Sequence, residues 1–130
     1  MTETINLREG LFRETPDGGA LLASRCKKCG QLHFPAGSIC LACRSNELTE
    51  IELSNEGELF CETQVHMKTP RFGAGYYVGY VTLPEGIRVF SQLRAVAGKA
   101  FKIGMKMKLE LVPIFQEDGK DVVAHRFYPA

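Results

Sequence analysis

Four cysteines form two Cys-x-x-Cys pairs, Cys26 with Cys29 and Cys40 with Cys43, and ten residues separate the two pairs. Two residues between paired thiolates let one tight turn aim both sulfurs at the same ion, and Zn²⁺ prefers four such ligands in a tetrahedron. The spacing therefore predicts one structural zinc site. Once four sulfurs are bound, no coordination position remains for the activated water that catalytic zinc needs.

Other roles for this segment compete with the zinc interpretation. A Cys-x-x-Cys motif can do redox chemistry, but such motifs occur singly, so a second pair at ribbon spacing argues against it. His33 could replace one cysteine, although four thiolates already satisfy zinc, so we expect a surface or hydrogen-bonded histidine. Basic side chains near the ligands either offset the negative charge of a zinc tetrathiolate, which is the commoner role, or bind phosphate. They are Arg25, Lys27, Lys28 and Arg44.

These cysteines are predicted to lie in a rubredoxin-like zinc ribbon, which a short helix precedes. Gly30 follows the second ligand, where a zinc knuckle commonly needs positive φ. Residues 31–35 alternate apolar and polar side chains, which predicts a short strand. Upstream, Leu11 and Phe12 recur with Leu7 at helical spacing and predict an amphipathic helix over residues 5–14. Because so short a helix is marginal alone, Leu11 and Phe12 must pack on this chain or on a partner, and both alternatives stay open.

Residues 57–128 show the alternation of β-strands. Strands are expected over residues 57–67, 76–83, 87–93, 105–111 and 122–127, with turns at the Pro and Gly residues between them. The alternation puts Cys61 on the apolar face with Leu59 and Val65, as a packed thiol rather than a nucleophile. Five strands with one irregular connection predict a small OB-type barrel, so we expect domains at residues 1–54 and 55–130.

Composition limits the classes of partner. Sixteen Lys and Arg against fifteen Asp and Glu give a net charge of +1, far from the basic excess of nucleic-acid binders. Hydrophobic residues make up 45% and charged residues 24%, as in globular proteins. No apolar run approaches the roughly 20 residues that span a bilayer, and the N-terminus lacks a basic start and apolar core of a signal peptide. A cytoplasmic location without membrane contact is expected.

The order of these motifs resembles the family of zinc-ribbon and OB-fold proteins associated with acyl-CoA metabolism. The resemblance rests on Leu21–Gly30 with the first cysteine pair, His33-Phe34-Pro35, the second pair, the hairpin around Gly86 and the closing Arg126-Phe127-Tyr128-Pro129. It covers nearly the whole chain. It implies a small zinc-binding subunit of a heteromer, whose partner is a thiolase-type enzyme, or a hydratase or aldolase acting on acyl-CoA.

The resemblance also implies that the chemistry belongs to the partner. A thiolase needs a cysteine activated by histidine, and Cys61, His33, His66 and His125 lie in no recognisable arrangement for it. The implied reaction is thiolysis of an aromatic acyl-CoA, such as benzoylsuccinyl-CoA in anaerobic degradation of the aromatic hydrocarbon toluene.

A loop expected at residues 68–75 offers a candidate contact with the coenzyme A thioester. Its cations Lys68 and Arg71 either pair with the phosphates of coenzyme A or are ordinary solvated charges. Nearby, Tyr76 and Tyr77 either border a pocket for an aromatic acyl group or belong to the core, which is the commoner role.

Two other functions stay open. Zinc ribbons and OB barrels commonly bind single-stranded nucleic acid, although the charge argues against it here. An independent acyl-CoA-binding or acyl-transfer protein would need a nucleophile and base that the sequence does not display.

Overall fold

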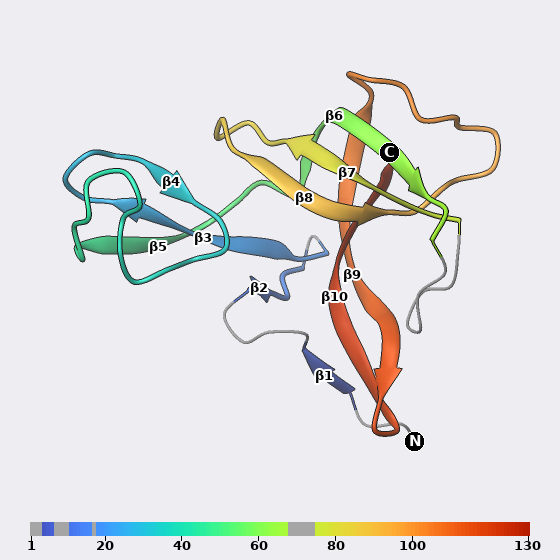
Figure 1. Cartoon of the computed structure of the whole chain (residues 1–130), viewed down its shortest axis with the longest axis horizontal. Helices are drawn as coiled ribbons and strands as arrows, with labels where there is room; N and C mark the ends of the chain where they lie inside the picture. Colours follow the sequence, from blue (N-terminus) through green and yellow to red (C-terminus); the bar gives the residue numbers. More distant parts are fainter. Residues whose placement is uncertain (1–3, 7–10, 17, 68–74) are drawn as a thin grey trace.

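The computed structural model describes residues 4–6, 11–16, 18–67 and 75–130. Within these ranges the chain forms ten β-strands and no helix. The strands are β1 Thr4–Asn6, β2 Phe12–Arg13, β3 Ala20–Cys26, β4 Leu32–His33, β5 Leu48–Glu52, β6 Glu56–Val65, β7 Tyr76–Thr82, β8 Arg88–Leu93, β9 Lys106–Glu117 and β10 Lys120–Pro129. They build a curled sheet and a small sheet that extends from it (Figure 1). Over the same ranges, no helix is long and apolar enough to cross a membrane.

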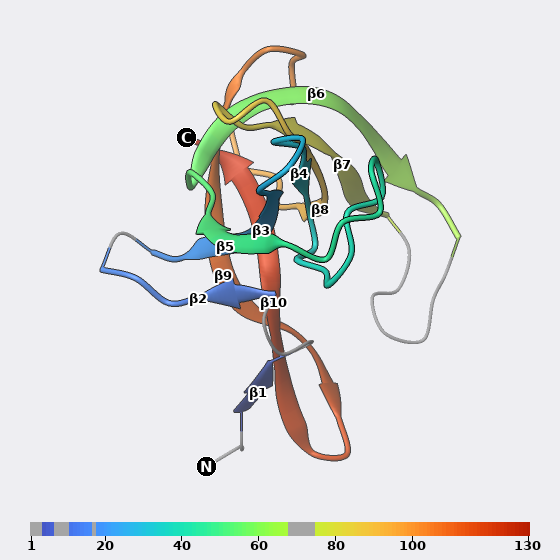
Figure 2. The ribbon, with the colours of Figure 1, turned by 90° about the vertical axis from the view of Figure 1, so that its left-hand side faces the viewer.

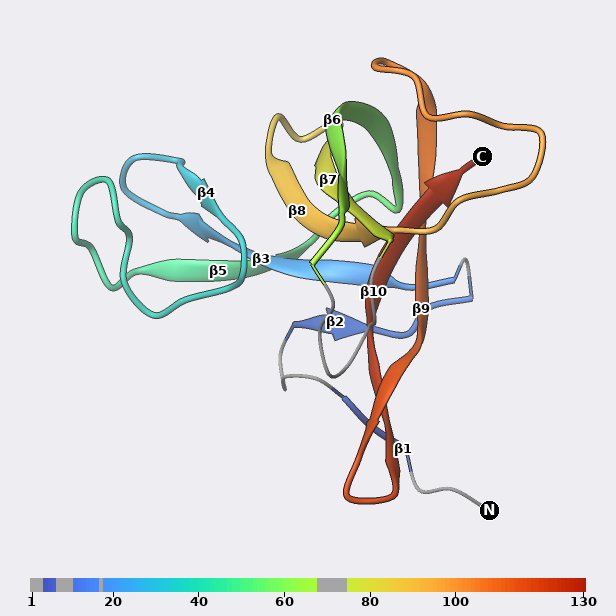
Figure 3. The same cartoon turned by 45° about the vertical axis from the view of Figure 1, so that its right-hand side comes forward.

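Five of the strands close into a barrel (Figure 3). β6, β7 and β8 form an antiparallel meander, β10 lies parallel to β8 and antiparallel to β9, and β9 returns to β6. This connectivity is that of the OB fold, so the predicted barrel is confirmed. β9 and β10 are longer than predicted because their hairpin projects beyond the barrel, where β1 pairs with Asp121–Val123.

The second sheet is the zinc ribbon, with β3 at its centre (Figure 2). β3 pairs antiparallel with β2 near its start and with β4 and β5 along its second half. β4 confirms the strand that alternation predicts at residues 31–35. The sequence did not predict β3 and β5. Residues 20–24 of β3 are all buried, and a continuous apolar run carries no period of two.

One hydrophobic core joins the ribbon to the barrel. Leu21 and Ala23 in the first half of β3 belong to the same buried cluster as the barrel side chains. Leu11, Phe12, Leu21, Ala23 and Leu53 come from the ribbon half, and Leu59, Val81, Leu83, Val89, Leu93, Met107, Leu109, Val123 and Phe127 come from the barrel. The two parts therefore fold around shared contacts.

The N-terminal segment differs from the predicted helix. Residues 4–6 and 12–13 are strands, and residues 7–10 lie outside the described part of the chain. β2 uses its hydrogen bonds to pair with β3, which places Leu11 and Phe12 in the core at 5% and 8% exposure. Sheet pairing thus overrode a helical spacing that rested on only a few apolar residues.

A β-bulge in β6 changes the predicted orientation of Cys61. Leu59 pairs with Val81 and both are buried, but the register shifts after Leu59, and Cys61 pairs with Tyr80, which is exposed. Cross-strand partners share a face of the sheet, so Cys61 lies on the outer face. The prediction that Cys61 shares the inner face with Leu59 is wrong, because the extra residue of the bulge reverses the alternation.

Candidate functional site

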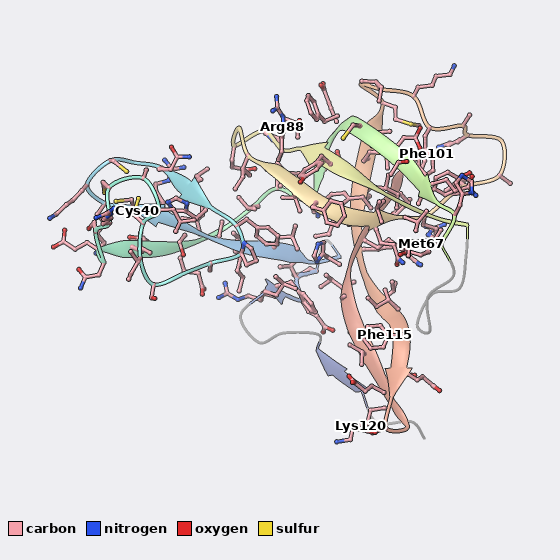
Figure 4. The ribbon with its side chains drawn as sticks, viewed as in Figure 1. Cys40, Met67, Arg88, Phe101, Phe115 and Lys120 are labelled. Atoms are coloured by element: carbon pink, nitrogen blue, oxygen red, sulfur yellow. The ribbon has the colours of Figure 1, made fainter. Side chains whose placement is uncertain are left out.

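The four predicted ligands come together at the far end of the ribbon, where Figure 4 shows Cys40. Their Sγ atoms all lie within 4.8 Å of one another. The Sγ atoms of Cys26 and Cys43 are 3.5 Å apart, as are those of Cys29 and Cys40. A zinc tetrathiolate with Zn–S bonds of about 2.3 Å has sulfur–sulfur edges of about 3.8 Å, whereas a disulfide measures about 2.05 Å. The arrangement therefore fits a single zinc ion.

Two matching turns, the zinc knuckles, present these sulfurs. The amide of Gly30 donates to the Cys26 carbonyl at 2.9 Å, and the amide of Arg44 donates to the Cys40 carbonyl at 2.8 Å. Gly30 has φ 78°, as predicted, and Arg44 has φ 64°. Sequence reasoning missed the left-handed Arg44, because an arginine does not by its type indicate positive φ as a glycine does. Its place after the second Cys-x-x-Cys was the available signal.

The four adjacent thiols alter one another's pKa values. The backbone amide of Cys43 and the side chain of His33 lower the pKa of Cys40 to about 5. The amide of Ser45 lowers the pKa of Cys43, but the thiol of Cys26, burial and the thiol of Cys40 outweigh it and raise that pKa to about 12. Four adjacent sulfurs cannot all ionise without an opposing charge, and a divalent metal supplies that charge.

His33 lies within hydrogen-bond distance of one of the four ligands. Its Nε2 lies 3.2 Å from the Cys40 Sγ, because pairing of β4 with β3 sets His33 opposite Ser24. The Ser24 hydroxyl also accepts a hydrogen bond from the Gly37 amide at 3.0 Å, which fixes the loop after β4. The four cysteines fill the tetrahedron, so the geometry supports His33 as a hydrogen-bond partner of a ligand.

The remaining predicted site residues fall into two groups. Lys68 and Arg71 lie outside the described residues. Leu11 and Phe12 are buried in the chain's own core, which corresponds to the first of the two alternatives for them. Contact of these two side chains with a partner stays a prediction, and it would require them to leave that core.

The two candidate pocket tyrosines lie in different surroundings, and the candidate nucleophile Cys61 has no histidine bonded to it within the described residues. Tyr77 packs toward the core, with its ring 5.0 Å from that of Phe101, while Tyr76 pairs with Val65 on the outer face. His125 binds the Phe90 carbonyl at 3.2 Å, and burial lowers its pKa. Within the described residues, no hydrogen bond joins Cys61 to a histidine.

Comparison with known proteins agrees with both parts of the fold. Residues 16–49 match the family described as the ChsH2 rubredoxin-like zinc ribbon domain, and residues 50–112 match the ChsH2 C-terminal OB-fold domain. The chain belongs to the ChsH2 family of zinc-ribbon and OB-fold proteins. The family match confirms the predicted resemblance and, with the cysteine cluster, supports structural zinc.

Relatives of the ChsH2 family align over most of their length. The chain is 35% identical over 125 residues to benzoylsuccinyl-CoA thiolase subunit BbsA of Thauera aromatica, covering 90% of this chain and 83% of the relative. It is 32% identical to a DUF35 domain-containing scaffold protein of Methanocaldococcus jannaschii, covering 91% and 87%. The solved Ltp2-ChsH2(DUF35) aldolase superposes with a TM-score of 0.69 at 27% identity, covering 85% of this chain and 84% of that chain.

Proposed function

We propose that this chain is a non-catalytic, zinc-stabilised subunit of a thiolase-type acyl-CoA enzyme. The observation that carries the proposal is the match over 83% of the length of BbsA, which is itself named as a thiolase subunit. The solved aldolase named Ltp2-ChsH2(DUF35) supports the idea that members of the family form complexes with a second protein. In this role the chain would stabilise its catalytic partner in the cytoplasm.

The zinc centre supports a structural role. Four thiolates leave no open position for substrate or activated water, so the metal would hold the two knuckles together and do no chemistry. Zinc would instead fix the orientation of β3, whose Leu21 and Ala23 pack in the core shared with the barrel. The centre therefore contributes to the shape that the partner recognises.

The substrate assignment belongs to the same proposal. We infer thiolysis of an aromatic acyl-CoA such as benzoylsuccinyl-CoA, because the relative that carries this name is 35% identical. Lys68 and Arg71 are the proposed contacts with the phosphates of coenzyme A, since two cations three positions apart in the sequence can pair with phosphate oxygens.

Co-purification tests this function. The tagged chain is expressed in its native host, and its stoichiometric partner is identified by mass spectrometry as a thiolase-type protein. The separately purified partner is then assayed for acyl-CoA thiolysis with and without the chain. We expect activity or solubility of the partner to depend on the chain, and the isolated chain to show no thiolysis. A partner that is equally soluble and active alone, with no complex by size-exclusion chromatography, would refute the proposal.

A further inference from the structure

Much of the outer face of β6, β7 and β8 carries uncharged, largely apolar side chains, where an antiparallel sheet normally turns polar side chains to solvent. The strand register defines this aromatic face. Cys61 pairs with Tyr80 and Tyr80 with Phe90, while Thr63 pairs with Val78 in the next row. The face comprises Phe60, Cys61, Thr63, Val65, Tyr76, Val78, Tyr80, Phe90 and Gln92, and none of these nine residues is charged.

Three aromatic side chains stand exposed at one end of the aromatic face. Phe60, Tyr80 and Phe90 are 45%, 42% and 55% exposed, and the rings of Tyr80 and Phe90 are 5.4 Å apart. The bulge in β6 brings Phe60 onto this face beside Cys61. The guanidinium of Arg88, which Figure 4 labels, lies 3.8 Å from the centre of the Phe60 ring. Aromatic residues with an arginine at the rim are the composition of protein-interface centres.

A cavity continues the aromatic face toward the β9–β10 hairpin. It measures about 360 Å³, and most of its lining is apolar, including Val65, Val78, Phe90 and Ile114, with Ser91, Gln92 and His125 as polar members. Nε2 of His125 lies 3.2 Å from the Phe90 carbonyl, and its buried Nδ1 has no hydrogen-bond partner. The described lining residues include no Asp, Glu, Lys or Arg and are mostly apolar, so the cavity suits an apolar side chain.

Charge decides between the kinds of occupant. Nucleic acid would bring many phosphates, which need several cations, and among the described outer-face residues of β6, β7 and β8 the one cation is Arg88, which is stacked on Phe60. Glu58 lies at the same edge, since it pairs with Thr82, which in turn pairs with Arg88. Its negative charge would repel a polyanion. An uncharged protein surface is complementary to this face.

The size of the aromatic face agrees with a protein partner. Three strands spaced about 4.8 Å apart and rows spaced about 7 Å apart give a patch of roughly 14 by 20 Å. A standard interface covers about 800 Å² on each partner, so this patch has the dimensions of its buried centre. We propose that the aromatic face docks onto an uncharged apolar surface of the thiolase-type catalytic subunit, one of whose apolar side chains enters the cavity beside His125. The proposal rests on the proposed function.

Paired substitutions test the docking surface. Phe90→Thr and Tyr80→Thr keep a strand-forming residue but remove the exposed rings. We expect the double variant to bind the purified catalytic subunit about 30-fold or more weakly by calorimetry, as for interface hot spots. Ile103→Thr is the matched control, because Ile103 is 67% exposed but lies between β8 and β9. The control should bind as the wild type does.

Cys61 gives a second readout that needs no substitution. It lies half-buried on the aromatic face, and the other four cysteines would be held by zinc. Iodoacetamide should therefore modify Cys61 in the free zinc-loaded chain and modify it at least several-fold more slowly in the complex. Equal rates in the two states would overturn the docking surface, even if the Thr variants failed to fold.

The remaining outcomes separate the two proposals. A wild type that forms no complex with a thiolase-type subunit removes the proposed function and this surface together. A complex that binds the double variant as tightly as the wild type removes the surface alone. Concentration-dependent self-association of the wild type, lost in the double variant, would identify a second copy as the occupant instead. Binding of a single-stranded oligonucleotide that the double variant loses would identify nucleic acid.

Discussion

At the scale of single residues, the two zinc knuckles differ where each leaves its metal ligands. Gly30 and Arg44 have φ 78° and 64°, and their amides close equivalent turns. A residue with a Cβ pays about 1–2 kcal/mol in this conformation, which glycine avoids. The second knuckle therefore carries strain that the first does not, and the Arg44 hydrogen bond to the Cys40 carbonyl helps to hold it.

Replacement of Gly30 should expose this cost. A Cβ at Gly30 would meet nothing within 4 Å, so Gly30→Ala adds conformational strain and no clash. We expect the free energy of unfolding of the zinc-loaded protein to fall by about 1 kcal/mol in chemical denaturation. Gly37→Ala is the control, because Gly37 lies in the same ribbon without positive φ and should not be destabilised. Equal stability of the Gly30 variant and the wild type would contradict the strain argument.

At the scale of elements, three charged side chains clamp the strands that close the barrel. Glu110 of β9 accepts hydrogen bonds from the Arg94 Nε at 2.7 Å and the Arg126 Nε at 2.8 Å. Arg126 belongs to β10, and Arg94 follows β8, so the cluster spans the parallel β10–β8 pair. Burial raises the pKa of Glu110, but the two arginines outweigh it and hold the pKa below its ordinary value.

Neutralising Glu110 should therefore weaken the barrel in a pH-dependent way. Its side chain is 19% exposed, and hydrogen bonds to charged groups contribute more than neutral ones, so we expect Glu110→Gln to cost about 1–2 kcal/mol at pH 7. Because the folded-state pKa is depressed, this stabilisation is full above the unfolded pKa of about 4.3. It is lost as pH falls through the folded pKa, so the two proteins should converge in acid.

Urea denaturation at several pH values measures that difference. Glu56→Gln serves as the control, because its pair with Lys106 is 3.3 Å long and both side chains are exposed, at 43% and 67%. An exposed pair of this kind contributes little, so the control should lose less than about 0.5 kcal/mol. A pH-independent loss in the Glu110 variant would show that packing, rather than charge, explains its effect.

The elements also show what the sequence could predict. The barrel strands and the cysteine cluster follow from local signals, namely alternation and ligand spacing. The bulge at Phe60 and Cys61 does not follow from such signals. The alternation of residues 59–65 looks the same in the sequence whether or not the register shifts after Leu59. The aromatic face depends on that bulge and on which strands become neighbours, so it appears only in three dimensions. Likewise, β2 is a strand because β3 pairs with it.

At the scale of the whole molecule, side chains far apart in sequence fasten the ribbon to the barrel. The Ser54 amide and hydroxyl both donate to the Glu85 carboxylate, at 3.1 and 2.7 Å, where the ribbon leads into the barrel. The ring of Phe34 packs edge-on against His125, with centroids 5.8 Å apart. Leu53 of the same joint is buried in the shared core. Because of these contacts, we expect the stability of the barrel to depend on the folded, metal-bound ribbon.

Removal of zinc should consequently destabilise the barrel as well as the ribbon. Structural zinc contributes about 10 kcal/mol or more of binding free energy, which is comparable to the whole stability of a domain this size. Since Leu11, Leu21 and Leu53 of the ribbon half fill the common core, unfolding of the knuckles should expose barrel side chains. Cys26→Ser, or a chelator added to the wild type, should abolish amide-exchange protection in β7 and β8. Cys61→Ser makes the same substitution away from the metal and should keep zinc and protection. Barrel strands that stay protected after zinc release would mean that the two parts fold independently despite their shared core.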